Sequence, residues 1–113
     1  MTLVAGDAQR LRALQRANEV REARSALKRQ IAAGKISASE VILSPSSEIE
    51  SMDVLALLMS QRYWGRTRSR EFLRAVLLSE TKTVGSMTDR QRHLLAEILT
   101  AQDRSLATNL PGS

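Results

Sequence analysis

Apolar and polar positions alternate with helical spacing in the middle of the chain, over residues 52–77. Val54, Leu57 and Leu58 fall on one side of a predicted helix, and neighbouring apolar residues fill much of the rest of its circumference. This pattern is typical of a buried central helix. Asp53 is the candidate N-cap, because its carboxylate can accept hydrogen bonds from the first free amides.

The central helix should end near Gln61, because Tyr63, Trp64 and Gly65 break the apolar pattern. We expect Gly65 to supply a positive φ in this turn, since glycine adopts that conformation more easily than other residues. A second helix should then begin near Thr67.

The second helix separates its arginines from its core residues. Arg70 and Arg74 share one stripe at about 100° per residue, whereas Phe72, Leu73 and Val76 cluster roughly 130° away. The apolar cluster should therefore face inward and the arginines outward.

A long helix is predicted to precede this pair, from about Asp7 to Ala33, with Gly34 as the C′ residue. Only its C-terminal half should contact the core, because Leu27 and Ile31 share a stripe with Val20, whereas Leu11 and Leu14 point elsewhere.

Two capping boxes mark the starts of the remaining helices. The first is Ser37 with Glu40, opening a short helix to about Leu43, and the second is Thr88 with Gln91. In the last helix we expect an inward stripe formed by Leu94, Leu95, Ile98 and Leu99. Arg90, Arg92 and His93 should lie outside that stripe. Residues 80–87 are predicted to form a loop with Gly85 at its turn.

Composition and length favour one small all-α domain. The 113 residues are 42% hydrophobic but only 3% aromatic, with five glycines and two prolines. We divide the chain into a basic N-terminal helix or arm (1–35), a helical domain (36–102) and a flexible tail (103–113). The absence of cysteine excludes disulfides and thiolate metal sites, and we expect no cofactor. No apolar run approaches the roughly 18 residues of a spanning helix, so we expect no membrane partner and a cytoplasmic location.

The formal net charge of +5 is unevenly distributed along the chain. Residues 1–35 hold eight basic and three acidic groups, residues 36–61 hold four acids and no base, and residues 62–74 hold five arginines and one acid. Small basic domains often bind nucleic acid or acidic membranes. The acidic segment should face away from a polyanion.

The strongest candidate site is the start of the second helix. A helix N-terminus carries free amides and about half a positive charge, so it attracts anions. Around it we expect phosphate contacts from a cluster that comprises Arg62, Trp64, Gly65, Arg66, Thr67, Arg68, Arg70 and Arg74. The alternative is that these charges form only a solvated face.

The long helix offers a second cationic surface. Arg21, Arg24 and Lys28 share a stripe with Arg10 that extends over roughly 27 Å. This stripe could meet several phosphates as an arm that becomes ordered on DNA. The alternative is an exposed helix with local ion pairs, such as Arg16 with Glu19.

Three further residues have alternative interpretations. Trp64 and Tyr63 are each either a plug over the core or a base-stacking wedge, and the plug is the more common role for an aromatic beside a turn. If Trp64 inserts between base steps, it would kink the DNA. His93 is typical of a surface histidine, because no cysteine or suitably placed serine accompanies it. We therefore expect no catalysis.

The order of segments ALKRQIAAGK, SASEVIL, MDVLALL, RTRSRE and DRQRHLLAEIL resembles the actinobacterial integration host factor-like proteins. The resemblance covers roughly residues 21–99. It implies a helix-two-turns-helix module like that of a small-subunit ribosomal protein, and sequence-tolerant binding of duplex DNA through backbone and minor groove. It also implies DNA bending, looping or compaction, a nucleoid location and assistance to site-specific recombination.

The match is incomplete at two places. In the central turn only Gly65 and Arg66 agree with the family pattern, and before the DRQR segment Lys82 is the one remaining cation. The resemblance thus adds Lys82, Arg90 and Arg92 as candidate DNA contacts, with Lys82 in doubt. We interpret the chain as a divergent member, with a phage or mobile element as its source.

Two other functions stay open. The ribosomal likeness makes structured RNA an alternative partner, and the acidic segment 36–61 could serve a helical protein-interaction adaptor. We expect a monomer in solution, and one molecule that bridges two duplexes remains an alternative.

Overall fold

The structure is a computed structural model that describes the backbone of residues 5–108 and the side chains of residues 6–103. Its helices are α1 (Ala5–Ala32), α2 (Ala38–Leu43), α3 (Val54–Met59), α4 (Arg66–Ala75), the 3₁₀ turn η1 (Val84–Ser86) and α5 (Asp89–Thr108). Residues 5–108 contain no strand, only an isolated bridge between Asp53 and Thr83. The prediction of an all-α fold with a long N-terminal helix and a compact bundle is confirmed.

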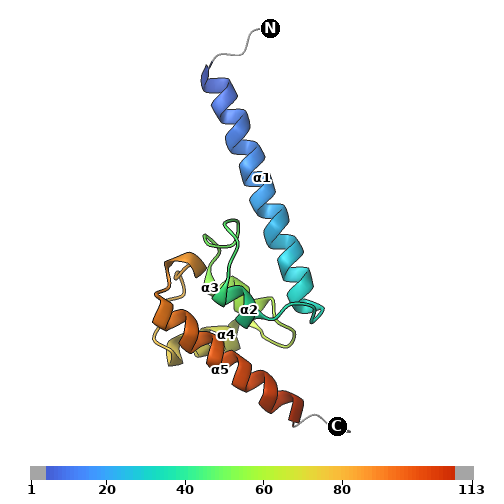
Figure 1. The fold of residues 1–113 in the computed structure, drawn as a ribbon, viewed down its shortest axis with the longest axis vertical. Helices are drawn as coiled ribbons and strands as arrows, with labels where there is room; N and C mark the ends of the chain where they lie inside the picture. Colours follow the sequence, from blue (N-terminus) through green and yellow to red (C-terminus); the bar gives the residue numbers. More distant parts are fainter. Residues whose placement is uncertain (1–4, 109–113) are drawn as a thin grey trace.

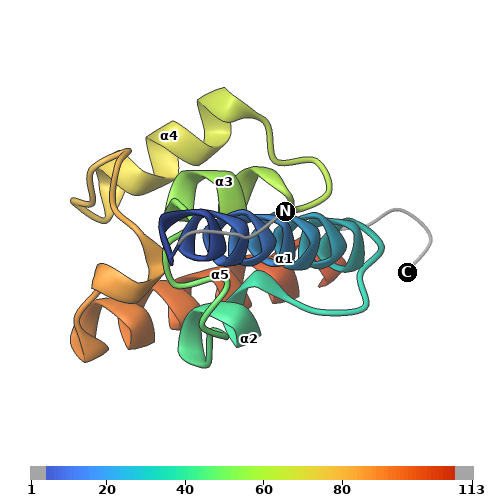
Figure 2. The same ribbon diagram turned by 90° about the horizontal axis from the view of Figure 1, so that it is seen from above.

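The helices form a bundle from which α1 projects (Figure 1). Within the bundle, α2 packs against α5 and α3 packs against α4. Viewed from above, α4 lies on one side of α3, with α2 and α5 on the other side (Figure 2). The molecule measures 66 × 30 × 24 Å, because the N-terminal half of α1 extends beyond the bundle.

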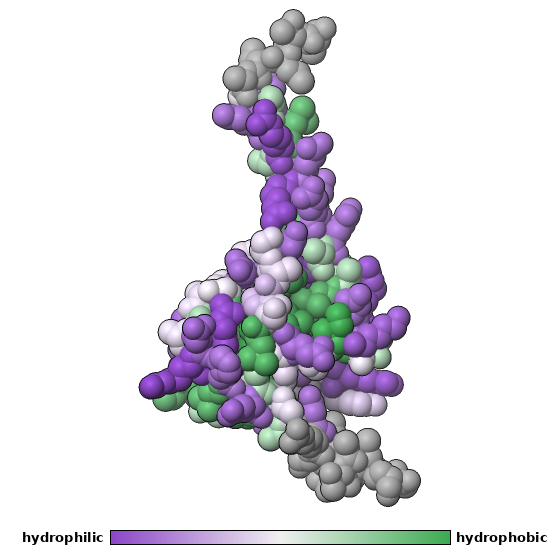
Figure 3. All heavy atoms as spheres, in the orientation of Figure 1, coloured by the Kyte–Doolittle hydropathy of each residue, from purple (hydrophilic) through white to green (hydrophobic). Residues whose placement is uncertain are grey.

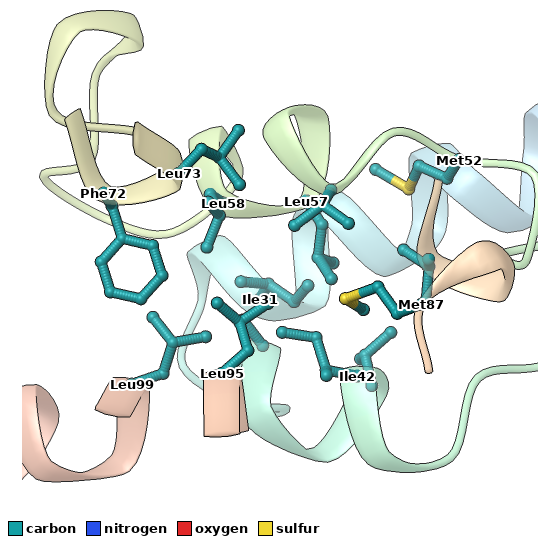
Figure 4. Close-up of a cluster of buried hydrophobic side chains, with 14 of the residues drawn as sticks. Ile31, Ile42, Met52, Leu57, Leu58, Phe72, Leu73, Met87, Leu95 and Leu99 are labelled. Atoms are coloured by element: carbon teal, nitrogen blue, oxygen red, sulfur yellow. The ribbon is translucent and has the colours of Figure 1, made fainter. Parts of the chain in front are cut away.

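Every α-helix contributes to one core (Figure 4). Its buried side chains include Ile31 of α1, Ile42 of α2, Leu57 and Leu58 of α3, Phe72 and Leu73 of α4, and Leu95 and Leu99 of α5. Leu11 and Leu14 are 49% and 55% exposed. In α1, Ile31 and Leu27 of the C-terminal half contact the core, whereas Leu11 and Leu14 do not.

The ends of the predicted helices carry the expected signals. Gly34 has φ 77°, and the amides of Gly34 and Lys35 donate to the carbonyls of Ile31 and Gln30, which is the Schellman pattern. The capping boxes of Ser37 with Glu40 and of Thr88 with Gln91 both form in each direction.

Asp53 occupies the N-cap position of α3, but its side chain makes no capping hydrogen bond, so that prediction is wrong. The amide of Val54 donates instead to the carbonyl of Lys82 at 2.8 Å, and the amide of Val84 donates to Met52 at 2.9 Å. The segment before α5 thus supplies the hydrogen-bond acceptor for the first amide of α3.

Gly85 lies in the turn η1, as predicted, and also allows a close backbone contact. A Cβ at this position would lie 2.8 Å from Cβ of Glu50, and the Gly85 amide donates to the Glu50 carbonyl at 2.7 Å. Glycine is needed here for close approach of two backbone segments.

The predicted inward stripe of α5 is rotated. Leu95 and Leu99 are buried as expected and Ile98 is partly buried, but Leu94 is 48% exposed and Ala96 is buried in its place. The centre of the buried face is thereby moved toward Arg92, which is half-buried rather than outside the stripe.

The predicted tail from Asp103 is also partly wrong, because α5 continues to Thr108. No proline or glycine interrupts the chain before Pro111, so nothing stops the helix at Asp103. The rest of the predicted tail, residues 109–113, lies outside the described residues.

Candidate nucleic-acid interface

The turn between α3 and α4 is built from short backbone hydrogen bonds. Gln61 donates to the carbonyl of Leu58 at 3.2 Å, and Trp64 donates to Gln61 at 3.1 Å. The left-handed residue is Tyr63, with φ 70°, whereas Gly65 is extended at φ −86° and ψ −178°. The prediction of a positive φ at Gly65 is therefore wrong.

Trp64 packs on the core. Its side chain is only 7% exposed, and its ring meets that of Phe72 edge-on with centroids 5.3 Å apart. The guanidinium of Arg68 covers the Trp64 ring at 4.2 Å from the centroid. Of the two interpretations of Trp64, the structure shows the plug.

The N-terminus of α4 is open. Gly65 is the N-cap and offers no side chain, and the first backbone bond of the helix runs from Ser69 to the Gly65 carbonyl at 3.1 Å. The amides of residues 66–68 are therefore without a helical partner. A Cβ on Gly65 would meet nothing within 4 Å, so an anion could approach this end closely.

One face of α4 carries Arg66, Arg70 and Arg74 at intervals of four residues, and we call this set the arginine stripe. Arg70 pairs with Glu80, with Nε and Oε1 at 2.9 Å, but both side chains are roughly half exposed (41% and 49%). Such a pair is weak and solvent-screened. The side chains of Arg66 and Arg74 form no ion pair or hydrogen bond within residues 6–103.

Residues of α1 and α4 line the same surface hollow, which has a volume of about 500 Å³. Its walls carry Lys28 and Arg29 of α1 and Arg66 of α4, and its other lining residues are Ala32, Ala56, Met59 and Ser60. We call this the basic hollow. The structure thus places a predicted residue of the N-terminal helix, Lys28, beside a predicted residue of the turn, Arg66.

Other α1 cations turn toward the bundle. Arg24 donates from Nε to the carbonyl of Glu48 at 3.3 Å and from Nη2 to the hydroxyl of Ser51. Arg16 pairs with Glu19 at 3.4 Å, the local ion pair named in the alternative interpretation, and also with Glu48 at 3.4 Å. These contacts fix α1 to the acidic segment between α2 and α3, whereas Arg21 stays exposed.

The carboxylate in this contact stays ionised. The pKa of Glu48 is lowered, first by a hydrogen bond from its own backbone N–H, and less by Ser46 and Arg16, while desolvation opposes the shift. Arg16 therefore faces a negative partner over the ordinary pH range.

The resemblance added three candidate DNA contacts before and within α5, namely Lys82, Arg90 and Arg92, and only Arg90 is exposed. Arg92 donates to the carbonyls of Ile42 at 3.1 Å and Gly85 at 3.2 Å, and Lys82 is half-buried, with its carbonyl bonded to Val54. None of them lines the basic hollow.

Hydrophilic side chains predominate on the projecting part of α1, which also shows a few hydrophobic ones, whereas the larger hydrophobic areas lie over the bundle (Figure 3). The sequence reasoning missed Arg29 of the basic hollow, because Arg29 lies off the stripe that contains Lys28. It also did not predict that, of the two adjacent aromatic residues, Tyr63 would be exposed and Trp64 buried. In the part of the chain that the structure describes, no cluster of three metal-ligating residues occurs. Nor is any described helix long and apolar enough to span a membrane.

Comparison with protein-family models gives no match, and no curated protein matches the chain. Among solved structures, sIHF bound to an 8-bp palindromic DNA has a similar fold, with a TM-score of 0.69. The two chains are 25% identical, and the similarity covers 75% of this chain and 98% of that chain. The fold is therefore similar to that of an integration host factor-type protein.

Proposed function

We propose that this protein is a non-enzymatic duplex DNA-binding protein whose contact surface is the basic hollow, the open N-terminus of α4 and the arginine stripe. The observation that carries the proposal is the convergence of Lys28, Arg29 and Arg66 beside the free amides of α4. The similar fold of sIHF, which was solved bound to DNA, supports the same partner.

The chemistry of this surface favours phosphates over base edges. Guanidinium groups and helix amides bind phosphate oxygens, which position a protein on DNA without reading its sequence. Arg62, Thr67 and Arg68 would extend the contact around the α4 start, Arg74 would extend it along α4, and Arg21 would extend it along α1. We therefore propose largely sequence-independent binding at the backbone and minor groove.

Two candidate contacts belong to the fold rather than to this surface. Arg24 donates to a backbone carbonyl and a serine hydroxyl, and Arg92 donates to two backbone carbonyls, so we assign them the positioning of α1 and α5. Arg90 and Lys82 remain candidates for contact with a second DNA duplex, which a protein that bridges two duplexes would need.

The biological roles that we propose follow from the resemblance to integration host factor-like proteins. Bending and compaction of DNA, a nucleoid location and assistance to recombination each require that the protein first bind duplex DNA. Contour length of DNA molecules at increasing protein concentration would report bending and compaction directly.

The primary test is a titration of two duplex DNAs of unrelated sequence and one duplex RNA of equal length. We expect the two DNAs to bind with similar Kd, at about 10⁻⁶ M at physiological salt, which is the tight end of the range for non-specific binding, and the RNA to bind more weakly. No duplex binding at micromolar protein would contradict the proposal. Preferential RNA binding would support the ribosomal-type alternative.

A further inference from the structure

Tyr63 is a large aromatic side chain that the core does not use. It is 76% exposed, whereas the next residue, Trp64, is 7% exposed and fills the space beside Phe72. The turn between α3 and α4 thus directs one aromatic ring inward and the adjacent one outward.

The backbone gives no reason for a tyrosine at this position. Its φ of 70° lies in the left-handed region, which bulky residues rarely adopt and which glycine or asparagine adopts more easily. Unfavourable conformations of this kind persist only where the surrounding structure holds them, and they cluster at functional sites.

A cation supports the exposed ring. The guanidinium carbon of Arg62 lies 5.3 Å from the centroid of Tyr63, within the range of a cation–π contact. Because the ring is still 76% exposed, most of its surface remains free to contact a ligand.

The ring stands beside the proposed phosphate-binding end of α4. Tyr63 precedes the N-cap Gly65 by two residues, so its Cα lies within about 7 Å of that residue along the chain. The minor groove of B-DNA is only about 6 Å wide, so a phosphate held at the α4 amides would bring the groove within reach of the ring.

Resting on the function proposed above, we propose that Tyr63 inserts its ring from the minor groove into a base step and stacks there, with Arg62 orienting it. Stacking on a base needs no particular base, because every base has an aromatic face. Partial unstacking by such a side chain kinks and unwinds the duplex. Tyr63, and not the buried Trp64, would then be the residue that deforms the DNA.

Unwinding of closed circular DNA tests the proposal with the full chain. Plasmid relaxed by a topoisomerase in the presence of wild-type protein should show a changed linking number after protein removal. Tyr63→Phe should keep this change, because it keeps the ring. Tyr63→Ala should abolish it and weaken binding by roughly five- to twentyfold, with an unchanged salt dependence, because no phosphate contact is lost.

Tyr63→Gly separates stacking from folding. Glycine removes the ring and also relieves the left-handed backbone, so this variant should be at least as stable as Tyr63→Ala in thermal unfolding, yet equally unable to unwind DNA. Unwinding by either ring-free variant, or binding without unwinding by the wild type, would overturn the role of Tyr63 while leaving DNA binding intact. Failure of the wild type to bind any duplex would instead overturn the proposed function itself.

Discussion

Leu77 and Gly34 occupy equivalent left-handed positions at the ends of two helices, with φ 60° and 77°. At the end of α4, Leu78 donates to the Leu73 carbonyl at 2.9 Å and Leu77 donates to Arg74 at 3.2 Å, which repeats the Schellman pattern of α1. A leucine in this conformation is unfavourable, and its side chain is 90% exposed, so it gains little from packing.

We expect Leu77→Gly to raise the free energy of unfolding by roughly 0.5 to 1 kcal/mol, because the left-handed backbone is relieved. Gly34→Ala, the reverse change at the matching position, should lower the free energy of unfolding by about 1 kcal/mol. Urea denaturation of both variants measures the two effects. A destabilised Leu77→Gly variant would show that the exposed leucine makes contacts that offset the strain.

The α3–α4 turn shows where sequence reasoning about single residues fails. Gly65 was the natural candidate for the left-handed conformation, but Tyr63 is the residue that adopts it. Trp64 packs in the core beside Phe72, and this packing places the left-handed conformation at the preceding residue, Tyr63. A local propensity cannot reveal which aromatic ring the core will accept.

At the scale of elements, α5 is held to the rest of the bundle by a side chain that sequence analysis assigned to DNA. Arg92 bonds to the carbonyl of Ile42 at the end of α2 and to that of Gly85 in η1. Its removal would leave both carbonyls without this partner. Arg90, two residues away, is exposed, and its side chain makes no hydrogen bond or ion pair within residues 6–103.

We expect Arg92→Met to lower the free energy of unfolding by about 1 to 3 kcal/mol, because it loses hydrogen bonds from a charged donor. Arg90→Met, which removes the same charge from an exposed position, should change stability by less than about 0.5 kcal/mol. Guanidinium denaturation would compare the two. Equal stability of both variants would contradict the positioning role of Arg92.

Local sequence patterns predict the helices and their ends well, but they do not predict the contacts between helices. Both capping boxes and the glycine end of α1 were predicted, since each involves residues three or four positions apart. The cap of α3 was not predicted, because the Val54 amide bonds to Lys82, far along the chain. The contact of Arg24 with the Glu48 carbonyl escaped prediction for the same reason.

At the scale of the whole molecule, the shape and the charge distribution both agree with the proposed DNA-binding surface. The radius of gyration is 17.2 Å, compared with about 13 Å for a compact domain of this length, because α1 carries its cations beyond the bundle. The acidic segment 36–61 draws Arg16 and Arg24 to one side of α1. Lys28 and Arg29 instead face the basic hollow together with Arg66.

The central claim is that free cations of this surface bind DNA phosphates. It is tested most directly by the slope of log K against log salt for wild type, Arg66→Gln and the double variant Arg66→Gln/Arg74→Gln. Arg12→Gln is the matched control, because Arg12 is exposed and lies roughly opposite Arg21 and Lys28 on α1. We predict that the magnitude of the slope falls by about 0.9 in the single variant and about 1.8 in the double variant, with no change in the control. Equal slopes in all four proteins would contradict the account.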